Sequence, residues 1–381
     1  MINPIIVAIG YNRFFALQRL LNALANAYYE EKVLLVISID YGGNPEVTKL
    51  AKQFEWSHGE KIVKTYDENM GLRKHIIKCG DLSMQYGAAI IFEDDILPSP
   101  YFYSYAKQAV NFYKDDQRIF AVSLYSQIWN GYSNRVFTPL KNEYDAFISQ
   151  IECSWGECFI GERWREFKAW YEVKEDKLEY NYNVPHAVYS WKDSRCKYLL
   201  YYIVEKHKYY LTPYDSLSTN FHNVGTHIAI PSSSYQVPLL CGDKKFRFPK
   251  FDDALKYDAF FESINLKEHL EKIYQSSKVC IDYYGLHRDY DSYDFCFSSA
   301  NLPYKVIESY GLEMRPPELN YYYKVEGEDL FLYDISTEQQ HKKKRKHHYN
   351  LLHYDMKDLH WIDSLFYTLF EWWMKIRRLG K

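Results

Sequence analysis

The sequence predicts an α/β fold in which a mostly parallel central sheet is flanked by helices, and three observations support this. Short apolar runs rich in Ile and Val alternate with segments of helical periodicity through residues 1–124. Such alternation is typical of strands joined by crossover helices. Polar side chains directly follow several of the apolar runs. The chain of 381 residues is also long for one core, so we expect an appendage or a second domain.

The apolar runs and the periodic segments give the expected order of elements. The first run, residues 5–9, is followed by a glycine and has the length of a buried strand. Residues 14–27 then place four leucines at helical spacing, which predicts the first helix. Further strands are expected at residues 33–39, 61–65, 88–92 and 119–124, and further helices at residues 47–54, 71–86 and 101–113.

The remainder of the chain has a less regular pattern. Residues 125–235 mix helix and loop, and the alternation is lost from about residue 236. Residues 265–335 suggest a small α+β appendage. We therefore expect an α/β domain over residues 1–235, an extension with this appendage over residues 236–335, and a basic linker with a terminal helix over residues 336–381.

Charge is unevenly distributed along the chain. Residues 341–381 contain ten Lys/Arg and four Asp/Glu, a net charge of +6, which leaves −9 on the first 340 residues because the whole chain carries −3. Such asymmetry suggests a basic tail that faces an anionic surface. The seven cysteines form no C-x-x-C pair, and the amino terminus lacks a basic region and a long apolar run. A reducing cytoplasm is the expected compartment.

The terminal segment has the pattern of an amphipathic helix preceded by the basic run HKKKRKHH. Large apolar side chains with flanking basic residues are typical of a helix in a bilayer interface, and each nearby Lys or Arg adds about 1 kcal/mol of attraction to anionic lipid. We expect peripheral attachment to the inner face of the cell membrane; a helix docked on this domain or on a second chain is the alternative. The acidic first 340 residues argue against a nucleic-acid partner. The apolar face contains Ile362, Leu365, Phe366, Leu369, Trp373 and Ile376.

Three consecutive carboxylates, Glu93, Asp94 and Asp95, follow the strand expected at residues 88–92. Adjacent anions repel one another, so a cation is expected against them. Hard oxygen ligands suit Mg²⁺ or Mn²⁺, which usually keep waters and complete their shells with substrate phosphates. A solvated acidic turn or a cap for the next helix is the alternative. Arg13 and Asp40 also follow expected strands, and ligands bind beyond the carboxyl ends of parallel strands.

The stretch IIFEDDILPSPYFYSYAKQAVNFYKDD resembles the acidic-motif segment of inverting, metal-dependent glycosyltransferases with the nucleotide-sugar-binding GT-A fold. The likeness is greatest to the family of N-acetylglucosaminyltransferase I and to related bacterial surface-polysaccharide glycosyltransferases. It extends through YNRFFALQRLLNAL, ISIDYGG and ENMGLRKHI, resumes in CSWGECFIGERW, and ends near SLSTNFHNVGTH. The resemblance covers roughly residues 3–235.

The resemblance implies binding roles for four residues near the nucleotide. Arg13 matches a position that approaches the nucleotide, and Asp40 matches one that hydrogen-bonds the base; a strand-end turn cap is the alternative for Asp40. His75 matches a position near the nucleotide, and Arg73 could face the diphosphate. A satisfied or solvated helix residue is the alternative for these last two.

The resemblance also implies a metal ligand set. Asp95 would bind Mn²⁺ or Mg²⁺ directly, with Glu93 and Asp94 nearer the sugar and the ribose. His227 is expected to reach the diphosphate or the metal when a loop closes, and packing within the loop is the alternative. The sequence departs from the bacterial pattern at His222 and the residue after it, where an acidic or glycine-containing stretch is more common.

Inverting transfer needs a general base that takes the proton of the acceptor hydroxyl. Asp193, in SWKDSRCKYLL, falls where the resembling enzymes place an acidic residue after a Trp. Glu157, in SWGECF, is the second candidate. A surface carboxylate that pairs with Lys192 or Lys197 is the alternative for Asp193.

Together these features imply a glycosyltransferase of bacterial surface-polysaccharide biosynthesis. It would move a sugar from a nucleotide-diphosphate donor, a UDP-sugar being favoured, to a hydroxyl of a glycan or lipid-linked glycan. One rival is a sugar nucleotidyltransferase, which would need a glycine-rich basic loop where GYNRFFA stands. The other is a catalytically inactive glycan-binding or scaffold protein of the same fold. Homo-oligomerisation is left open.

Overall fold

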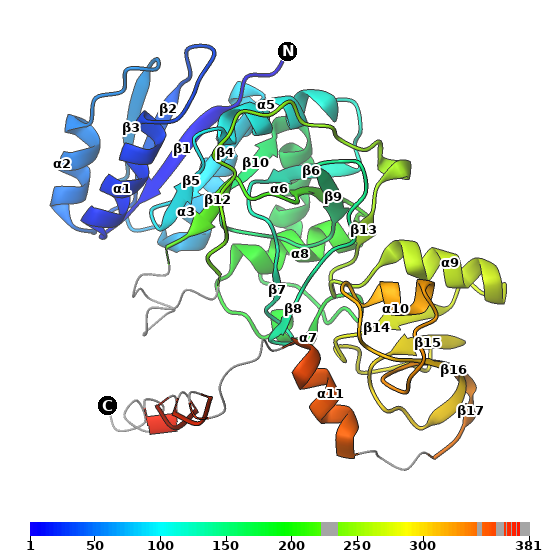
Figure 1. The fold of residues 1–381 in the computed structure, drawn as a ribbon. Coiled ribbons are helices and arrows are strands. Elements are labelled where there is room, and N and C mark those ends of the chain that lie inside the picture. Colours follow the sequence, from blue (N-terminus) through cyan, green and yellow to red (C-terminus); the bar gives the residue numbers. More distant parts are fainter. Residues whose placement is uncertain are drawn as a thin grey trace. The chain divides into compact units, whose positions relative to one another are not determined.

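The computed structural model (Figure 1) describes residues 1–221, 235–340 and 345–355, together with positions 362, 364–366, 368–370 and 372–373. The chain forms two compact units. The first contains residues 1–275 and 286–288, and the second contains residues 276–285 and 289–381. Each unit has its own sheet.

A nine-stranded sheet forms the centre of the first unit (Figure 1), in the order β13-β9-β11-β6-β10-β4-β1-β2-β3. Neighbouring strands are parallel, except that β10 is antiparallel to β4 and β6, and β9 to β11. The mostly parallel central sheet that the sequence predicts is therefore confirmed. The strands are β1 (Ile5–Gly10), β2 (Leu35–Ile39), β3 (Lys61–Thr65), β4 (Ala88–Glu93), β6 (Ile119–Ser123), β9 (Ala146–Ser149), β10 (Glu157–Ile160), β11 (Tyr209–Pro213) and β13 (Lys256–Tyr257).

Helices cover both faces of this sheet, and the central strands are apolar on both sides for that reason. Ile6 and Ala8 of β1 belong to a core built with three helices, whereas Ile5, Val7 and Ile9 belong to a second core built with five others. The two sets alternate because successive strand side chains point to opposite faces. The first core contains α1 (Phe14–Ala25), α2 (Pro45–Gln53) and α5 (Phe102–Phe112); the second contains α3 (Gly71–Gly80), α4 (Leu82–Tyr86), α6 (Gly161–Lys174), α7 (His186–Tyr189) and α8 (Arg195–Glu205).

The predicted helix over residues 71–86 is divided into α3 and α4 at Asp81. The Asp81 carboxylate accepts a hydrogen bond from Trp164 Nε1 at 2.8 Å and one from Lys168 Nζ at 2.9 Å. These bonds tie the junction to α6, and Trp164 is fully buried. The break thus follows from tertiary packing, which periodicity does not reveal.

The second unit contains both helices and strands, and it begins at residue 276, whereas the α+β appendage was expected from residue 265. Its sheet has the order β14-β15-β17-β16, and the unit also contains two described helices. The expected boundary at residue 235 differs from the observed division, since β13 adds to the central sheet and Phe246 and Phe248 join the first core. The elements are β14 (Val279–Asp282), β15 (Phe295–Ser298), β16 (Tyr304–Tyr310), β17 (Leu330–Glu338), α10 (Glu318–Tyr322) and α11 (Arg345–Asp355).

No helix in the described part of the chain is long and apolar enough to cross a bilayer. The described positions between 362 and 373 are helical, and their large apolar side chains are exposed.

Gly80→Ala should destabilise the first unit. A Cβ atom at this position would lie 2.1 Å from Cζ2 of the buried Trp164, and overpacking of this kind costs about 1–3 kcal/mol. Gly242→Ala is the matched control, because a Cβ there meets no atom within 4 Å. Urea denaturation followed by fluorescence should show a lower free energy of unfolding for Gly80→Ala alone; equal values for the two variants would contradict the packing.

Candidate functional site

The acidic triplet lies where β4 ends, beside the end of β1. The two strands are parallel neighbours, with Ile9 paired to Glu93, so the residues that follow them meet at one edge of the sheet. Arg13 binds both aspartates there. Its Nε and Nη2 donate to the two oxygens of Asp94, and Nη1 and Nη2 donate to Asp95 Oδ2 at 3.2 Å. The cation that the sequence requires is, in this structure, the Arg13 guanidinium.

Burial and charge oppose one another at this pair. Burial raises the pKa of Asp94 to about 6, although Arg13 lowers it. Burial also lowers the pKa of Arg13, but the two aspartates outweigh this effect and raise it overall. A buried carboxylate is stable only with such a partner. Arg13 therefore keeps the acidic turn in place.

A second guanidinium, Arg19 of α1, lies close to the same turn. Its carbon Cζ is 3.9 Å from the centroid of the Phe221 ring, and its pKa is lowered by burial but raised by Asp95 and Asp94. The Nε and Nη2 atoms of Arg19 are buried and have no hydrogen-bond partner among the described residues. The sequence pattern did not single out this arginine; its two free donors next to an acidic turn identify it here.

Asp40 follows β2 and holds the amino end of α3. Its carboxylate accepts hydrogen bonds from the backbone N–H groups of Tyr41, Met70 and Gly71, at 2.9, 3.1 and 3.1 Å. These contacts match the turn cap weighed as an alternative for Asp40. The predicted contact with a nucleotide base is not tested by them and stays a prediction.

His75 of α3 is buried against β2. One ring nitrogen, Nε2, lies 2.7 Å from Ser38 Oγ. Burial lowers the pKa of His75 to about 4, despite the nearby Asp40 carboxylate, so the ring is neutral at neutral pH. His75 thus joins α3 to β2 through Ser38, two residues before Asp40. Its predicted proximity to a nucleotide stays a prediction.

Glu93 turns away from Arg13 toward a second buried arginine, Arg195, at the start of α8. Arg195 forms ion pairs with Glu157 and, at 3.6 and 3.7 Å, with Glu152 and Glu93. Glu157 also accepts a hydrogen bond from Tyr210 at 3.1 Å. One guanidinium thus faces three carboxylates from β4, β10 and the loop before β10.

Burial is the main cause of the raised pKa values of the carboxylates in this cluster. Burial, reinforced by Glu152, raises the pKa of Glu157 to about 8 even though Arg195 lowers it. Burial likewise raises the pKa of Glu93 to about 7. Glu157 is fully buried, so the described structure gives an acceptor hydroxyl no access to it; its role as a base stays a prediction.

The other base candidate, Asp193, lies on the surface. Its side chain is 90% exposed, and Oδ1 is 3.7 Å from Nη2 of Arg73. Arg73 also donates to the Tyr198 hydroxyl at 2.9 Å and pairs with Asp176 at 3.4 Å. Asp193 therefore contacts Arg73, whereas the alternative reading expected Lys192 or Lys197. The contact of Arg73 with a diphosphate is likewise still a prediction.

The residues at the acidic turn suit a metal ion only if other ligands complete its shell. No group of three or more His, Cys, Asp or Glu within the described residues is placed to hold an ion. The side chain of Asp95 uses Oδ2 for Arg13, and Oδ1 makes no hydrogen bond to the described residues. One carboxylate oxygen with waters and substrate phosphates is a normal environment for Mg²⁺. Asp95 fits that role; His227, the other predicted ligand, lies outside the described residues.

Comparison with known proteins gives structural neighbours only. No family model matches the sequence, and no curated protein matches it. Solved structures that match include the mannosyltransferase PcManGT from Pyrobaculum calidifontis in complex with GDP-Man and Mn²⁺, at 12% identity and a TM-score of 0.36 over 61% of this chain and 58% of that one. TarS 1–349 of S. aureus matches at 12% identity and a TM-score of 0.35, over 56% of this chain and 58% of that one. GalNAc-T7 with UDP, GalNAc and Mn²⁺ matches at 14% identity and a TM-score of 0.41, over 56% of this chain and 42% of that one.

The first of these neighbours is a mannosyltransferase, and the third is a complex with UDP, GalNAc and Mn²⁺. The chain covers less than two thirds of each of these three proteins. Because every TM-score is below 0.5, no role is transferred from them to residues of this chain.

The buried glutamate cluster predicts a pH dependence of stability. Folded Glu157 holds its proton up to about pH 8, whereas an unfolded Glu with the ordinary pKa of 4.5 has lost it. The free energy of unfolding should therefore fall as the pH rises from about 4.5 to about 8. Glu157→Gln should reduce the fall, as measured by urea denaturation at several pH values.

Glu162→Gln provides the control for this measurement, because Glu162 is an exposed carboxylate on α6. It should leave the slope of the free energy of unfolding against pH unchanged. If Glu157→Gln also left this slope unchanged, Glu157 would be ionised in the folded protein.

Proposed function

We propose that the first unit is a glycosyltransferase that uses a nucleotide-diphosphate sugar as donor. One observation carries this proposal: Arg13, Asp40 and the Asp94–Asp95 turn lie at the carboxyl ends of three neighbouring parallel strands. In open α/β sheets this edge is where nucleotides bind. The resemblance of the surrounding sequence motifs to GT-A glycosyltransferases supports the same assignment.

The arginines at this edge suit a diphosphate. Guanidinium groups recognise phosphate oxygens through paired N–H donors. Two buried donors of Arg19 beside the turn have no partner within the described part of the chain, and Arg13 lies between the same turn and the end of β1. In the proposed reaction these groups hold the diphosphate and stabilise the charge it gains as the sugar leaves.

A divalent ion, Mn²⁺ or Mg²⁺, is the proposed cofactor, and Asp95 would hold it. The ion would supply Lewis-acid stabilisation of the leaving diphosphate. The exposed carboxylate of Asp193 is the better supported base, because a base must reach the proton of the acceptor hydroxyl. Attack from the face opposite the diphosphate would invert the sugar carbon. The proposed acceptor is a glycan or lipid-linked glycan of bacterial surface-polysaccharide synthesis.

Nucleotide binding tests the proposal directly. UDP with Mn²⁺ should raise the melting temperature of the full chain by several degrees, since a ligand that binds only the folded state stabilises it. Asp95→Asn should remove the Mn²⁺-dependent part of the shift and lower donor hydrolysis about 10²-fold, the usual effect of losing one electrostatic contact to the reacting group.

Asp115→Asn, which alters an exposed carboxylate after α5, should leave both measurements unchanged. Absence of a shift with every nucleoside diphosphate, with or without Mn²⁺, would refute the assignment. Pyrophosphate release from a nucleoside triphosphate would favour a nucleotidyltransferase instead.

We also propose that the carboxyl-terminal segment attaches the protein to the cytoplasmic face of an anionic membrane. Leu365, Phe366 and Trp372 are more than half exposed, and the basic run 341–348 precedes them. An exposed apolar helix with basic flanks gains free energy from both burial and charge at such a surface. A lipid-linked acceptor would be reached at the same surface.

Liposome flotation of the full chain with anionic vesicles should show binding that is lost when the chain is truncated after Gln340. Phe366→Glu should weaken binding, because a charge then replaces an apolar side chain in the interface. Tyr182→Glu, at an exposed tyrosine of the first unit, is the matched control. Full binding by the truncated chain would refute the attachment.

A further inference from the structure

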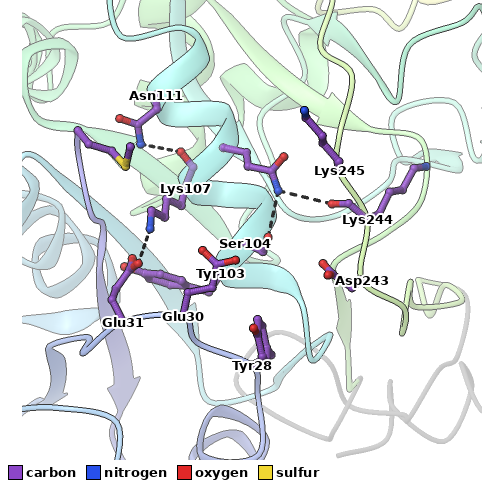
Figure 2. Close-up of a pocket in the computed structure, with 12 residues that line it drawn as sticks. Tyr28, Glu30, Glu31, Tyr103, Ser104, Lys107, Asn111, Asp243, Lys244 and Lys245 are labelled. Atoms are coloured by element: carbon purple, nitrogen blue, oxygen red, sulfur yellow. Dashed lines mark hydrogen bonds and ion pairs between the residues drawn. The ribbon is translucent and has the colours of Figure 1, made fainter.

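A cavity of about 560 Å³ lies beside α5 (Figure 2). Its lining comes from Met1 ahead of β1, from residues 28–31 ahead of β2, from α5, and from residues 243–245. Met1 and residues 28–31 precede parallel strands, so the cavity belongs to the amino-terminal edge of the sheet. The acidic turn and Arg13 lie at the opposite edge, which makes this a separate site.

The walls of the cavity are held by interactions within the protein. Asn111 of α5 accepts from the N–H of Ile2 at 2.8 Å and donates to its carbonyl at 2.7 Å. Lys107, one turn earlier, forms an ion pair with Glu31. Figure 2 shows the ion pair between Lys107 of α5 and Glu31, which precedes β2. A cavity whose walls are already fixed loses little entropy when a ligand binds.

Tyrosines give the cavity an aromatic wall. Tyr28 is 49% exposed, and its ring centroid is 5.7 Å from that of Tyr101. Tyr103 is buried, with its ring centroid 5.4 Å from that of Tyr29. The C–H faces of a pyranose ring pack well on such surfaces, because aromatic side chains offer a large apolar area with little loss of side-chain entropy.

Two buried polar atoms at the wall have no better partner among the described residues than each other. The Tyr103 hydroxyl and Glu31 Oε1 form no well-aligned hydrogen bond there, but the hydroxyl interacts with Glu31, which adds to the effect of burial in raising the pKa of Tyr103. Buried polar atoms are normally bonded. A small side-chain rotation would present both to a hydroxyl group, which can donate to the carboxylate and accept from the phenol.

The charges around the cavity exclude a strongly ionic ligand. Three carboxylates and three ammonium groups line it. Lys107 forms an ion pair with Glu31, and Lys244 forms one with Asp145, which lies outside the lining. A nucleotide or a phosphorylated lipid headgroup would bring charge that this balanced lining does not match. A neutral ligand rich in hydroxyl groups does match it. The six charged residues are Glu30, Glu31, Lys107, Asp243, Lys244 and Lys245.

We propose that this cavity is a second binding site, for a neutral carbohydrate of one or two sugar units, distinct from the site of transfer. Its volume is within the usual range of about 300–1,000 Å³ for small-molecule sites. The inference depends on the cavity alone and would stand if the first unit transferred no sugar. In a glycosyltransferase, a site at this edge would hold a remote part of a glycan chain while its end is extended at the opposite edge.

Saturation-transfer NMR on the full chain provides the test. The probes are methyl pyranosides of glucose, galactose, mannose and N-acetylglucosamine, and the disaccharides lactose and cellobiose, at millimolar concentration. At least one should receive saturation, and Tyr28→Ala should weaken its binding at least tenfold. Tyr28 is exposed enough for this variant to fold, and Tyr182→Ala, at another exposed tyrosine, should bind normally.

Measurements on two variants distinguish this site from the proposed donor site. Asp95→Asn should bind the sugar as the unaltered chain does, and Tyr28→Ala should keep the thermal shift with UDP and Mn²⁺. The proposal is overturned if none of the probes binds, if Tyr28→Ala binds as well as the unaltered chain, or if Asp95→Asn abolishes binding. If UDP and Mn²⁺ did not raise the melting temperature of the unaltered chain, the proposed transferase would be refuted and this inference would stand.

Discussion

The pairing of Arg13 with Asp94 and Asp95 is the interaction on which the candidate site depends. It joins the ends of two neighbouring parallel strands, and it compensates the Asp94 carboxylate, which burial alone would drive toward the neutral form. A buried carboxylate without such a partner would cost several kcal/mol. Within the described residues, the pair also leaves one oxygen of Asp95 without a hydrogen bond. The proposed metal site would use this oxygen, so the contact that stabilises the turn is compatible with that proposal.

The end of β4 divides the acidic triplet between two arginines. Glu93 is the last residue of the strand and pairs with Arg195, whereas Asp94 and Asp95 form the turn after it and both bind Arg13. Arg195 in turn connects β4 to β10 and α8 through Glu157. The charge of the three adjacent anions, which looks unfavourable in the sequence, is thus compensated by two guanidinium groups from different parts of the chain.

Much of the fold could be predicted because its elements have strong local patterns. The expected strand at residues 61–65 matches β3, and the strands around β1, β2, β4 and β6 are found within about two residues of their predicted ends. The meeting of Arg13 with Asp94 also follows from the sequence once parallel pairing is assumed. Arg195, Arg19 and the break at Asp81 could not be predicted, since each depends on a partner far away in the chain. The two residues of β13 were too few to give a strand signal.

The contrast between Glu157 and Asp193 shows why sequence could name base candidates but not choose between them. The motif SWGECF places Glu157 beside a glycine, yet pairing of β10 with both β4 and β6 buries it against Arg195. Asp193 precedes Arg195 by two residues, in a left-handed backbone conformation with φ of 48° that Asp tolerates better than most residues. Because Arg195 anchors the start of α8 to Glu93, the exposed Asp193 is tied to the same strand end as Asp95. If the proposed roles hold, the base candidate Asp193 and the metal-ligand candidate Asp95 are thereby both connected to the end of β4, the first through Arg195 and the second through the chain itself.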